Sequence, residues 1–241
     1  GALPEGGDPR DTTYPYAYGE TENAYAQFVP SLKLGDDTTL ELGLSYSGSE
    51  FRSEFPEWDW SGRWRIHDLA VAPKLTTAFE LGVPHTLTAG LDYQGADLHD
   101  ITFGLGDMHR HEAGYYLSDT LALVPDQLFL DLGYRRARVN YDYANYTDAA
   151  HDLDAWRAGL TWNYAPQSKL FLSFDRSYRT QKLEELGGDY LDTPVAPQVS
   201  RQYQAGVRHH FADWLTAAVT AFQIDSRDEI LADYFYGPTW W

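Results

Sequence analysis

Histidine and aspartate residues are concentrated in one short stretch of the chain, between residues 97 and 111. Imidazole and carboxylate groups are common metal ligands, and a His-x-His sequence on a strand points both rings to the same side. The stretch could therefore hold a metal ion, or it could be a solvated loop whose polar side chains bind nothing specific. We favour the solvated loop and expect no resident metal or cofactor. The candidate metal ligands are His99, Asp100, Asp107, His109 and His111.

Tryptophan and tyrosine residues are concentrated in two other polar stretches, at 58–64 and 141–146. Exposed aromatic rings could grip a planar or sugar-like ligand, because each offers a flat apolar face beside a polar edge. Packing of long loops on one another is the alternative interpretation. Together with the histidines, the candidate ligand contacts are Trp58, Trp60, Trp64, His99, His109, His111, Tyr141, Tyr143, Tyr146 and His151.

Two adjacent His-Asp pairs, at 99–100 and 151–152, resemble fragments of a hydrolytic site. Catalysis needs a base, a group that orients it and a nucleophile within mutual reach, and adjacency in sequence supplies none of this geometry. The chain also has no cysteine, which removes thiol catalysis and thiolate metal sites. We therefore expect no enzymatic activity.

The composition favours strands that have one polar face. The 241 residues are 43% hydrophobic and 15% aromatic, yet the mean hydropathy is only −0.48. Apolar residues are thus diluted among polar ones, as in alternating strands, and none of the apolar runs approaches the roughly 18 residues of a membrane helix. The formal charge of −18 disfavours nucleic acid as a partner, because nucleic-acid binding needs a basic surface.

Period-two alternation of apolar and polar residues predicts ten strands. The pattern is clearest at 40–46, where Leu40, Leu42, Leu44 and Tyr46 alternate with small or polar residues. The ten expected strands are Glu22–Leu34, 39–46, His67–Leu81, 86–93, Tyr115–Val124, Leu128–Arg135, Trp156–Tyr164, Lys169–Arg179, Tyr203–Phe211 and Trp214–Asp225.

The connections between these strands alternate in length. Short turns centre near residues 36, 83, 125, 166 and 212, about 41 to 47 residues apart. The other connections are long and polar, at 47–66, 97–110, 140–152 and 180–199. Short turns at one rim and long loops at the other are typical of an outer-membrane β-barrel, with the long loops extracellular.

The alternation also predicts which residues face lipid and which face the lumen. Apolar rows would meet lipid at Leu42, Leu91, Leu130 and Leu160, with Tyr46, Tyr93 and Tyr134 forming an interfacial girdle. Polar rows would face the lumen at Thr88, Asp131 and Thr161. On the lumen side we expect Arg135, Arg157, Arg179 and Arg208 to pair with carboxylates, since a buried charge needs a partner.

Several segments resemble, in order, motifs of TonB-dependent outer-membrane receptors. Residues 200–230 resemble the hairpin S-x-x-Y-E-x-G-x-K/R, turn, D-x-I, and 85–93 resemble the strand H-T-L-x-x-G-x-D-Y. Residues 116–119 resemble Y-x-Q-D, while 174–179 with 183–186 resemble S-R-G-F-R and the following E-L. The chain departs from these patterns at Gln204, Ser118 and Thr180.

The resemblance implies an antiparallel up-and-down transmembrane β-barrel of roughly 22 strands in the bacterial outer membrane. Residues 1–241 would then be one partial barrel domain of about ten strands, with the plug domain and C-terminal strands outside the chain. It implies TonB-energised uptake of a scarce small molecule or metal chelate, such as an iron-siderophore, haem or cobalamin. The implied partners are outer-membrane lipid and lipopolysaccharide, the plug domain, the TonB complex and the ligand.

Three other interpretations remain open at the level of sequence. A soluble propeller also has a repeat in the forties, although only two strands per repeat are recognisable here. A passive outer-membrane pore or adhesin would share the same alternation. An omptin-like outer-membrane protease would explain the His-Asp pairs but not the order of the receptor motifs.

Overall fold

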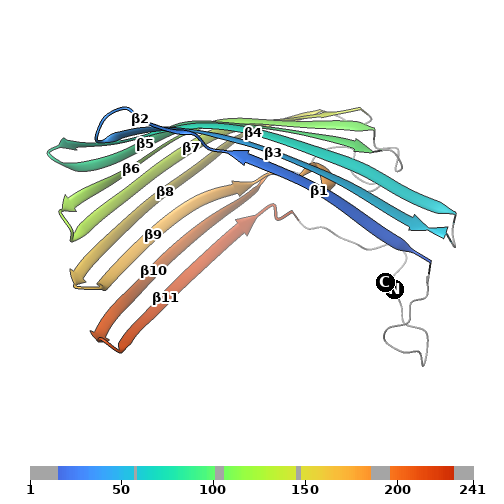
Figure 1. Ribbon diagram of the computed structural model, residues 1–241. Helices are drawn as coiled ribbons and strands as arrows, with labels where there is room; N and C mark the ends of the chain where they lie inside the picture. The colour runs from blue at the N-terminus through green and yellow to red at the C-terminus, as the bar shows by residue number, and fades with distance from the viewer. Residues whose placement is uncertain (1–15, 57–58, 101–105, 145–147, 186–195, 231–241) are drawn as a thin grey trace, which may run out of the picture.

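One antiparallel sheet of eleven strands makes up almost all of the computed structural model, which describes residues 16–56, 59–100, 106–144, 148–185 and 196–230. Each long strand pairs with the next, so the order is up and down from β1 to β11, and the sheet is strongly curved (Figure 1). The elements are β1 Tyr18–Phe28, β2 Ser31–Lys33, β3 Thr38–Phe55, β4 Trp60–Leu81, β5 Val83–Asp100, β6 Asp107–Val124, β7 Leu128–Tyr143, β8 Ala149–Ala165, β9 Ser168–Arg179, the 3-10 helix η2 Leu183–Glu185, β10 Gln198–Ala212 and β11 Leu215–Arg227.

The five predicted short turns are confirmed, and all lie at one end of the sheet (Figure 1). Four of them contain a residue with positive φ: Gly35 at 151°, Gly82 at 75°, Asp126 at 63° and Gln167 at 57°. Tight turns between twisted antiparallel strands need such conformations, which glycine and short polar residues adopt most readily. The part of the chain that is described contains no helix long and apolar enough to cross a membrane.

The first predicted strand, Glu22–Leu34, is wrong as a single element. It is two strands, β1 and β2, separated by Val29 and Pro30. Proline has no N–H to donate to a ladder, but its carbonyl still accepts a bond from the Leu42 nitrogen at 3.0 Å. The register with β3 is the same on both sides of the break, so Pro30 interrupts the strand without displacing it.

The predicted long loops are also wrong over most of their length. Strands β3 and β4 remain paired up to Phe55 opposite Trp60, where the sequence predicts a loop from 47 to 66. Likewise β5 and β6 pair up to His99 opposite Asp107, and β7 and β8 up to Tyr141 opposite Ala149. Beyond the aromatic girdle the outer face is polar and the apolar side chains, such as Leu98, Met108 and Val139, lie on the inner face. The phase of the alternation is therefore reversed there, although the hydrogen-bonded ladder continues.

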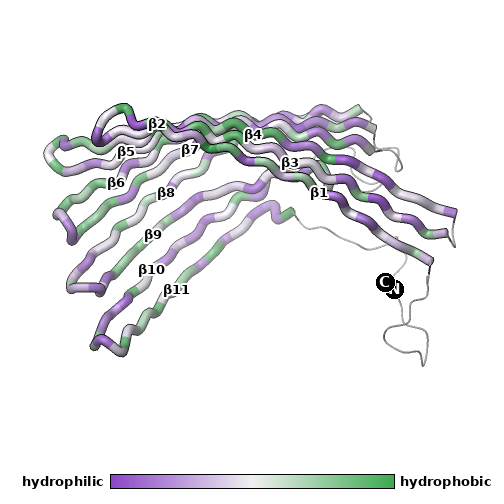
Figure 2. The backbone as a smooth tube through the Cα atoms, in the orientation of Figure 1, coloured by the Kyte–Doolittle hydropathy of each residue, from purple (hydrophilic) through white to green (hydrophobic). Residues whose placement is uncertain are grey.

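The register assigns every residue of the paired strands to one of two faces. We call the face that carries Leu91 the outer face and the one that carries Thr88 the inner face. Leu42, Leu91, Leu130 and Leu160 share the outer face, and Thr88, Asp131 and Thr161 share the inner face, as predicted. Figure 2 shows the resulting alternation of hydrophobic and hydrophilic residues along the strands.

Large apolar side chains on the outer face are exposed in the described part of the chain. Leu91 is 59% exposed and Leu172 57% exposed. Closer to the long-hairpin end of the sheet lies a row of outer-face aromatic residues, each 40–51% exposed, which includes the predicted girdle. They are Tyr46, Tyr93, Tyr115, Tyr134 and Trp156. An apolar band edged by aromatic rings is what a bilayer requires of a barrel wall.

Aromatic side chains on the inner face lie over glycines of the neighbouring strand. A Cβ atom at Gly90 would lie 2.4 Å from the Tyr116 ring, and one at Gly206 would lie 2.4 Å from the Phe171 ring. Each glycine is directly opposite its aromatic partner in the register. The missing side chain therefore lets each ring lie flat against the inner wall, where any larger residue would displace it.

Candidate functional site

A cavity of about 560 Å³ lies on the inner face, toward the end of the sheet that carries the long hairpins. Its wall is formed by β3, β4, β5 and β6, and the chain from Tyr178 to Leu183 closes its other side. The lining includes four aromatic residues, with polar groups from Asp68, Gln94 and Arg110. The aromatic residues are Tyr25, Tyr46, Trp64 and Tyr178. Aromatic surface with a few convergent polar groups is characteristic of small-molecule sites.

Arg110 is the most enclosed charge in this cavity, with 8% of its surface exposed. Its guanidinium donates to the carboxylate of Glu112 and, at 2.7 Å, to the hydroxyl of Thr180. Its Nε atom is buried without a hydrogen-bond partner among the described residues. A buried guanidinium N–H with no acceptor is costly, so this atom is available to an acceptor that enters the cavity.

Glu112 connects Arg110 to a second arginine. It is 7% exposed, and Arg135 contacts its other oxygen at 2.9 Å. Arg135 also donates to Asp92 from its Nε at 3.2 Å, and its guanidinium lies 5.3 Å from the centre of the Tyr178 ring. Asp92 and Arg135 come from β5 and β7, so side chains two strands apart meet here, as they can on the concave side of a curved sheet.

The segment from Thr180 to Glu185 folds onto the inner wall and is fixed there at several points. Leu183 of η2 is 2% exposed and packs in an apolar cluster with Met108 and Val139. The Tyr141 hydroxyl donates to the Gln181 carbonyl at 2.7 Å, and Arg179 forms an ion pair with Glu185. This segment thus covers part of the inner wall that the strands alone would leave open.

Three predicted ligand contacts lie beneath this segment. Tyr141 and Tyr143 are 2% and 6% exposed, and their rings stack at 5.8 Å, while His151 meets the edge of Tyr141. Burial raises the pKa of both tyrosines above the usual value, because the phenolate would lose its hydration. The sequence left packing of long loops on one another as the alternative to ligand contact. At these residues the structure shows such packing.

Three of the four predicted histidines, His99, His109 and His111, lie on the outer face. His99 and His109 are directly opposite Asp107 and Asp97, and both imidazoles pair with those carboxylates, His109 at 2.5 Å. His111 accepts or donates a 3.0 Å hydrogen bond with the Tyr93 hydroxyl. The described residues contain no group of three or more His, Cys, Asp or Glu that could hold a metal ion. Whether these histidines contact a ligand stays a prediction.

The remaining predicted residues fall into two groups. Trp64 lines the cavity and stacks on Phe51 at 5.3 Å, and Trp60 lies near Phe55 at the end of the hairpin. Trp58, Tyr146 and the side chain of Asp100 lie outside the described residues. The structure therefore brings one predicted aromatic residue, Trp64, to the inner cavity.

Sequence reasoning missed Arg110, Glu112 and Tyr178, yet a signal for the first two was present. In the segment His109-Arg110-His111-Glu112, histidines alternate with charged residues. Extending the two-residue period of the following strand back through the expected loop would have placed Arg110 and Glu112 on the inner face. Tyr178 gave no such signal. Its contact with Glu112, at 3.4 Å, joins residues 66 positions apart in sequence.

The expected pairing of inner-face arginines with carboxylates is confirmed for three of four. Arg135 pairs with Asp92 and Glu112, Arg157 lies 3.5 Å from Asp175, and Arg179 pairs with Glu185. Arg208 lies on the inner face opposite Lys169 and forms no ion pair in the described part of the chain.

A curved antiparallel sheet with an exposed apolar outer face edged by an aromatic girdle, and with polar and charged side chains on its inner face, is a section of an outer-membrane β-barrel wall. A family model, TonB dependent receptor-like, beta-barrel, matches residues 2–239. The chain belongs to the TonB-dependent receptor β-barrel family, which confirms the predicted family and fold class. Among curated proteins no match was found.

Solved structures of receptors share this fold at low sequence identity. The ferric-catecholate import receptor Fiu of E. coli K12 superposes with a TM-score of 0.69 at 13% identity, over 87% of this chain and 41% of Fiu. The alcaligin receptor FauA of Bordetella pertussis gives 0.68 at 18% identity, over 87% and 37%. The ferric citrate transporter FecA gives 0.72 at 14% identity, over 89% and 36%. The chain thus spans roughly two fifths of the length of these receptors.

Removing Arg135 should destabilise the protein more than removing Arg157. Arg135→Met leaves Glu112, which is 7% exposed, with one cation fewer, so we expect a loss of about 1–3 kcal/mol in the free energy of unfolding. Arg157 is 63% exposed, and Arg157→Met should cost less than about 1 kcal/mol. Urea unfolding of the complete protein in lipid vesicles measures both, and equal losses would show that the Glu112 network contributes nothing special.

Proposed function

We propose that the protein of which this chain is part is an outer-membrane receptor that imports an iron chelate with energy supplied through TonB. The observation that carries the proposal is the family match over residues 2–239, combined with an inner-face cavity of small-molecule size. The receptors that superpose on the chain are named for ferric catecholate, alcaligin and ferric citrate. An iron chelate is therefore the ligand class that we assign.

We propose that the chelate contacts the cavity between β3–β6 and the segment from Tyr178 to Leu183. Trp64 and Tyr178 offer aromatic surface there, and Gln94 and Arg110 offer hydrogen bonds to the oxygen atoms of a chelate. Arg110 and Arg179 are each neutralised by a glutamate of this chain. They supply N–H donors more than net positive charge, which favours a chelate of modest negative charge.

The remaining partners follow from the same proposal. Residues 1–241 would form one section of a larger closed barrel, because β1 and β11 are the two edges of the described sheet and open edges are not tolerated in a bilayer. A plug domain would occupy the lumen and contact the TonB complex. Lipid and lipopolysaccharide would cover the outer face, whose large apolar residues are exposed.

Uptake should require TonB. We expect iron-starved cells that make the complete receptor to accumulate radioactive iron from its cognate chelate, and cells lacking TonB to lose this accumulation while still binding the chelate at the surface. A panel of ferric catecholates, hydroxamates and citrate identifies the chelate. Undiminished uptake without TonB would refute energised transport and favour a passive pore.

Trp64 should contribute to chelate binding at the cavity. Trp64→Ala removes one of the four aromatic residues of the lining, and an aromatic contact of about 1 kcal/mol corresponds to roughly fivefold weaker binding. Trp64→Phe keeps a ring and should retain most of the affinity. Trp156→Ala is the matched control, because Trp156 lies on the outer face, where its ring contacts Phe174 in a tilted arrangement at 4.5 Å between ring centres. Equal losses for Trp64→Ala and Trp156→Ala would show that the cavity is not the binding site.

A further inference from the structure

Two cations face each other on the inner face, close to the short-turn end of the sheet. Lys169 of β9 and Arg208 of β10 are directly opposite in the register, and both side chains are exposed. Like charges at directly opposite positions repel each other and destabilise a sheet. An anion placed between the two cations would remove this repulsion.

The chain itself shows this compensation at another pair. Arg52 of β3 and Arg63 of β4 are also directly opposite, and the carboxylate of Glu50 lies between them, at 2.7 and 2.6 Å. At Lys169 and Arg208 the described residues supply no such carboxylate. Neither cation forms an ion pair or a side-chain hydrogen bond with the described residues.

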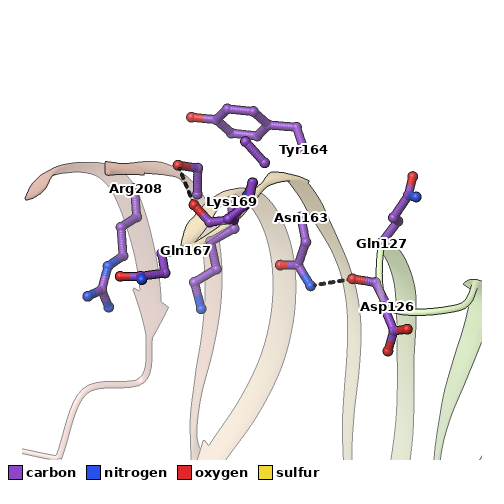
Figure 3. Close-up of a pocket in the computed structure, with 10 residues that line it drawn as sticks. Asp126, Gln127, Asn163, Tyr164, Gln167, Lys169 and Arg208 are labelled. Carbon is purple, nitrogen blue, oxygen red and sulfur yellow. Dashed lines mark hydrogen bonds between the residues drawn. The ribbon is translucent and has the colours of Figure 1, made fainter. Parts of the chain in front are cut away.

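The two cations line a cavity of about 720 Å³ between the short turns (Figure 3). Gln167, left-handed at φ 57°, lies in the turn between β8 and β9 and lines the same cavity. Figure 3 shows the ends of the Arg208, Gln167 and Lys169 side chains directed to the same side of the turn. The Asn163 amide donates to the Asp126 carbonyl at 3.0 Å, so the neighbouring turn is fixed and its carboxylate forms no ion pair with either cation in the described structure.

We propose that Lys169, Arg208 and Gln167 form a binding site for an oxyanion, a carboxylate or a phosphate. The ammonium and guanidinium groups offer only donors, and the guanidinium fork matches two oxygens of such an anion. The Gln167 amide adds N–H donors. The site faces the lumen, so the anion comes from one of two sources: a carboxylate of another segment of the same protein, or free phosphate in solution.

The test compares the unfolding temperature of the complete protein in detergent at low ionic strength with those of Lys169→Gln and Arg208→Gln. If a carboxylate of the protein occupies the site, each substitution lowers the midpoint by about 2 °C or more, and phosphate has no added effect. If free phosphate is the ligand, inorganic phosphate raises the wild-type midpoint more than chloride of equal ionic strength does, and both variants lose the difference.

Lys33→Gln is the control, because Lys33 is exposed and lies opposite Thr39 rather than a cation. Its midpoint and its phosphate response should match those of the wild type. The proposal is overturned if Lys169→Gln and Arg208→Gln leave the midpoint unchanged or raise it while phosphate acts no differently from chloride. That result would identify an uncompensated repulsive pair with no bound anion.

Discussion

The continuous hydrogen-bonded ladder from β1 to β11 is the constraint on which the rest of the structure depends. In a bilayer each backbone N–H and C=O must find its partner within the protein, so the register cannot slip. A fixed register with a period of two then sends every second side chain to lipid and every other one to the lumen. The apolar band at Leu91 and the polar cluster at Glu112 are two consequences of the same geometry.

The inner face shows how the ladder also positions a site. Residues 92, 110, 112 and 135 come from three strands, and the curvature of the sheet brings their side chains together. Glu112 holds two arginines that would otherwise repel each other, and the segment 180–185 attaches to the same cluster through Thr180. The cavity at Trp64 therefore depends on ion pairs formed within the wall rather than on the loops alone.

Much of this architecture is predictable from sequence because the membrane imposes a pattern. The lipid row, the girdle at Tyr46, Tyr93 and Tyr134, and all five short turns follow from alternation and turn residues. Pro30 was a visible interruption that the sequence reasoning did not use.

The hairpin ends escape prediction for a physical reason. Beyond the girdle the outer face is polar and the apolar side chains are on the inner face, so His99 and His109 look like loop residues although they lie in paired strands. These histidines lie on the outer face because they share the strand register of Leu91. The local composition does not reveal that the strand continues that far. The burial of Tyr141 beneath Leu183 needs a contact between distant segments that no local pattern encodes.

Cysteine labelling in the assembled protein tests the two-faced wall most directly. Leu91→Cys should react with a lipid-phase reagent and resist a water-soluble one, whereas Thr88→Cys, three residues away on the inner face, should show the reverse wherever the lumen is wet. Leu130→Cys and Asp131→Cys on β7 repeat the comparison. A folded protein in which Leu91→Cys and Leu130→Cys are both shielded from the lipid-phase reagent would show that this row is a protein core, and the membrane account would be wrong.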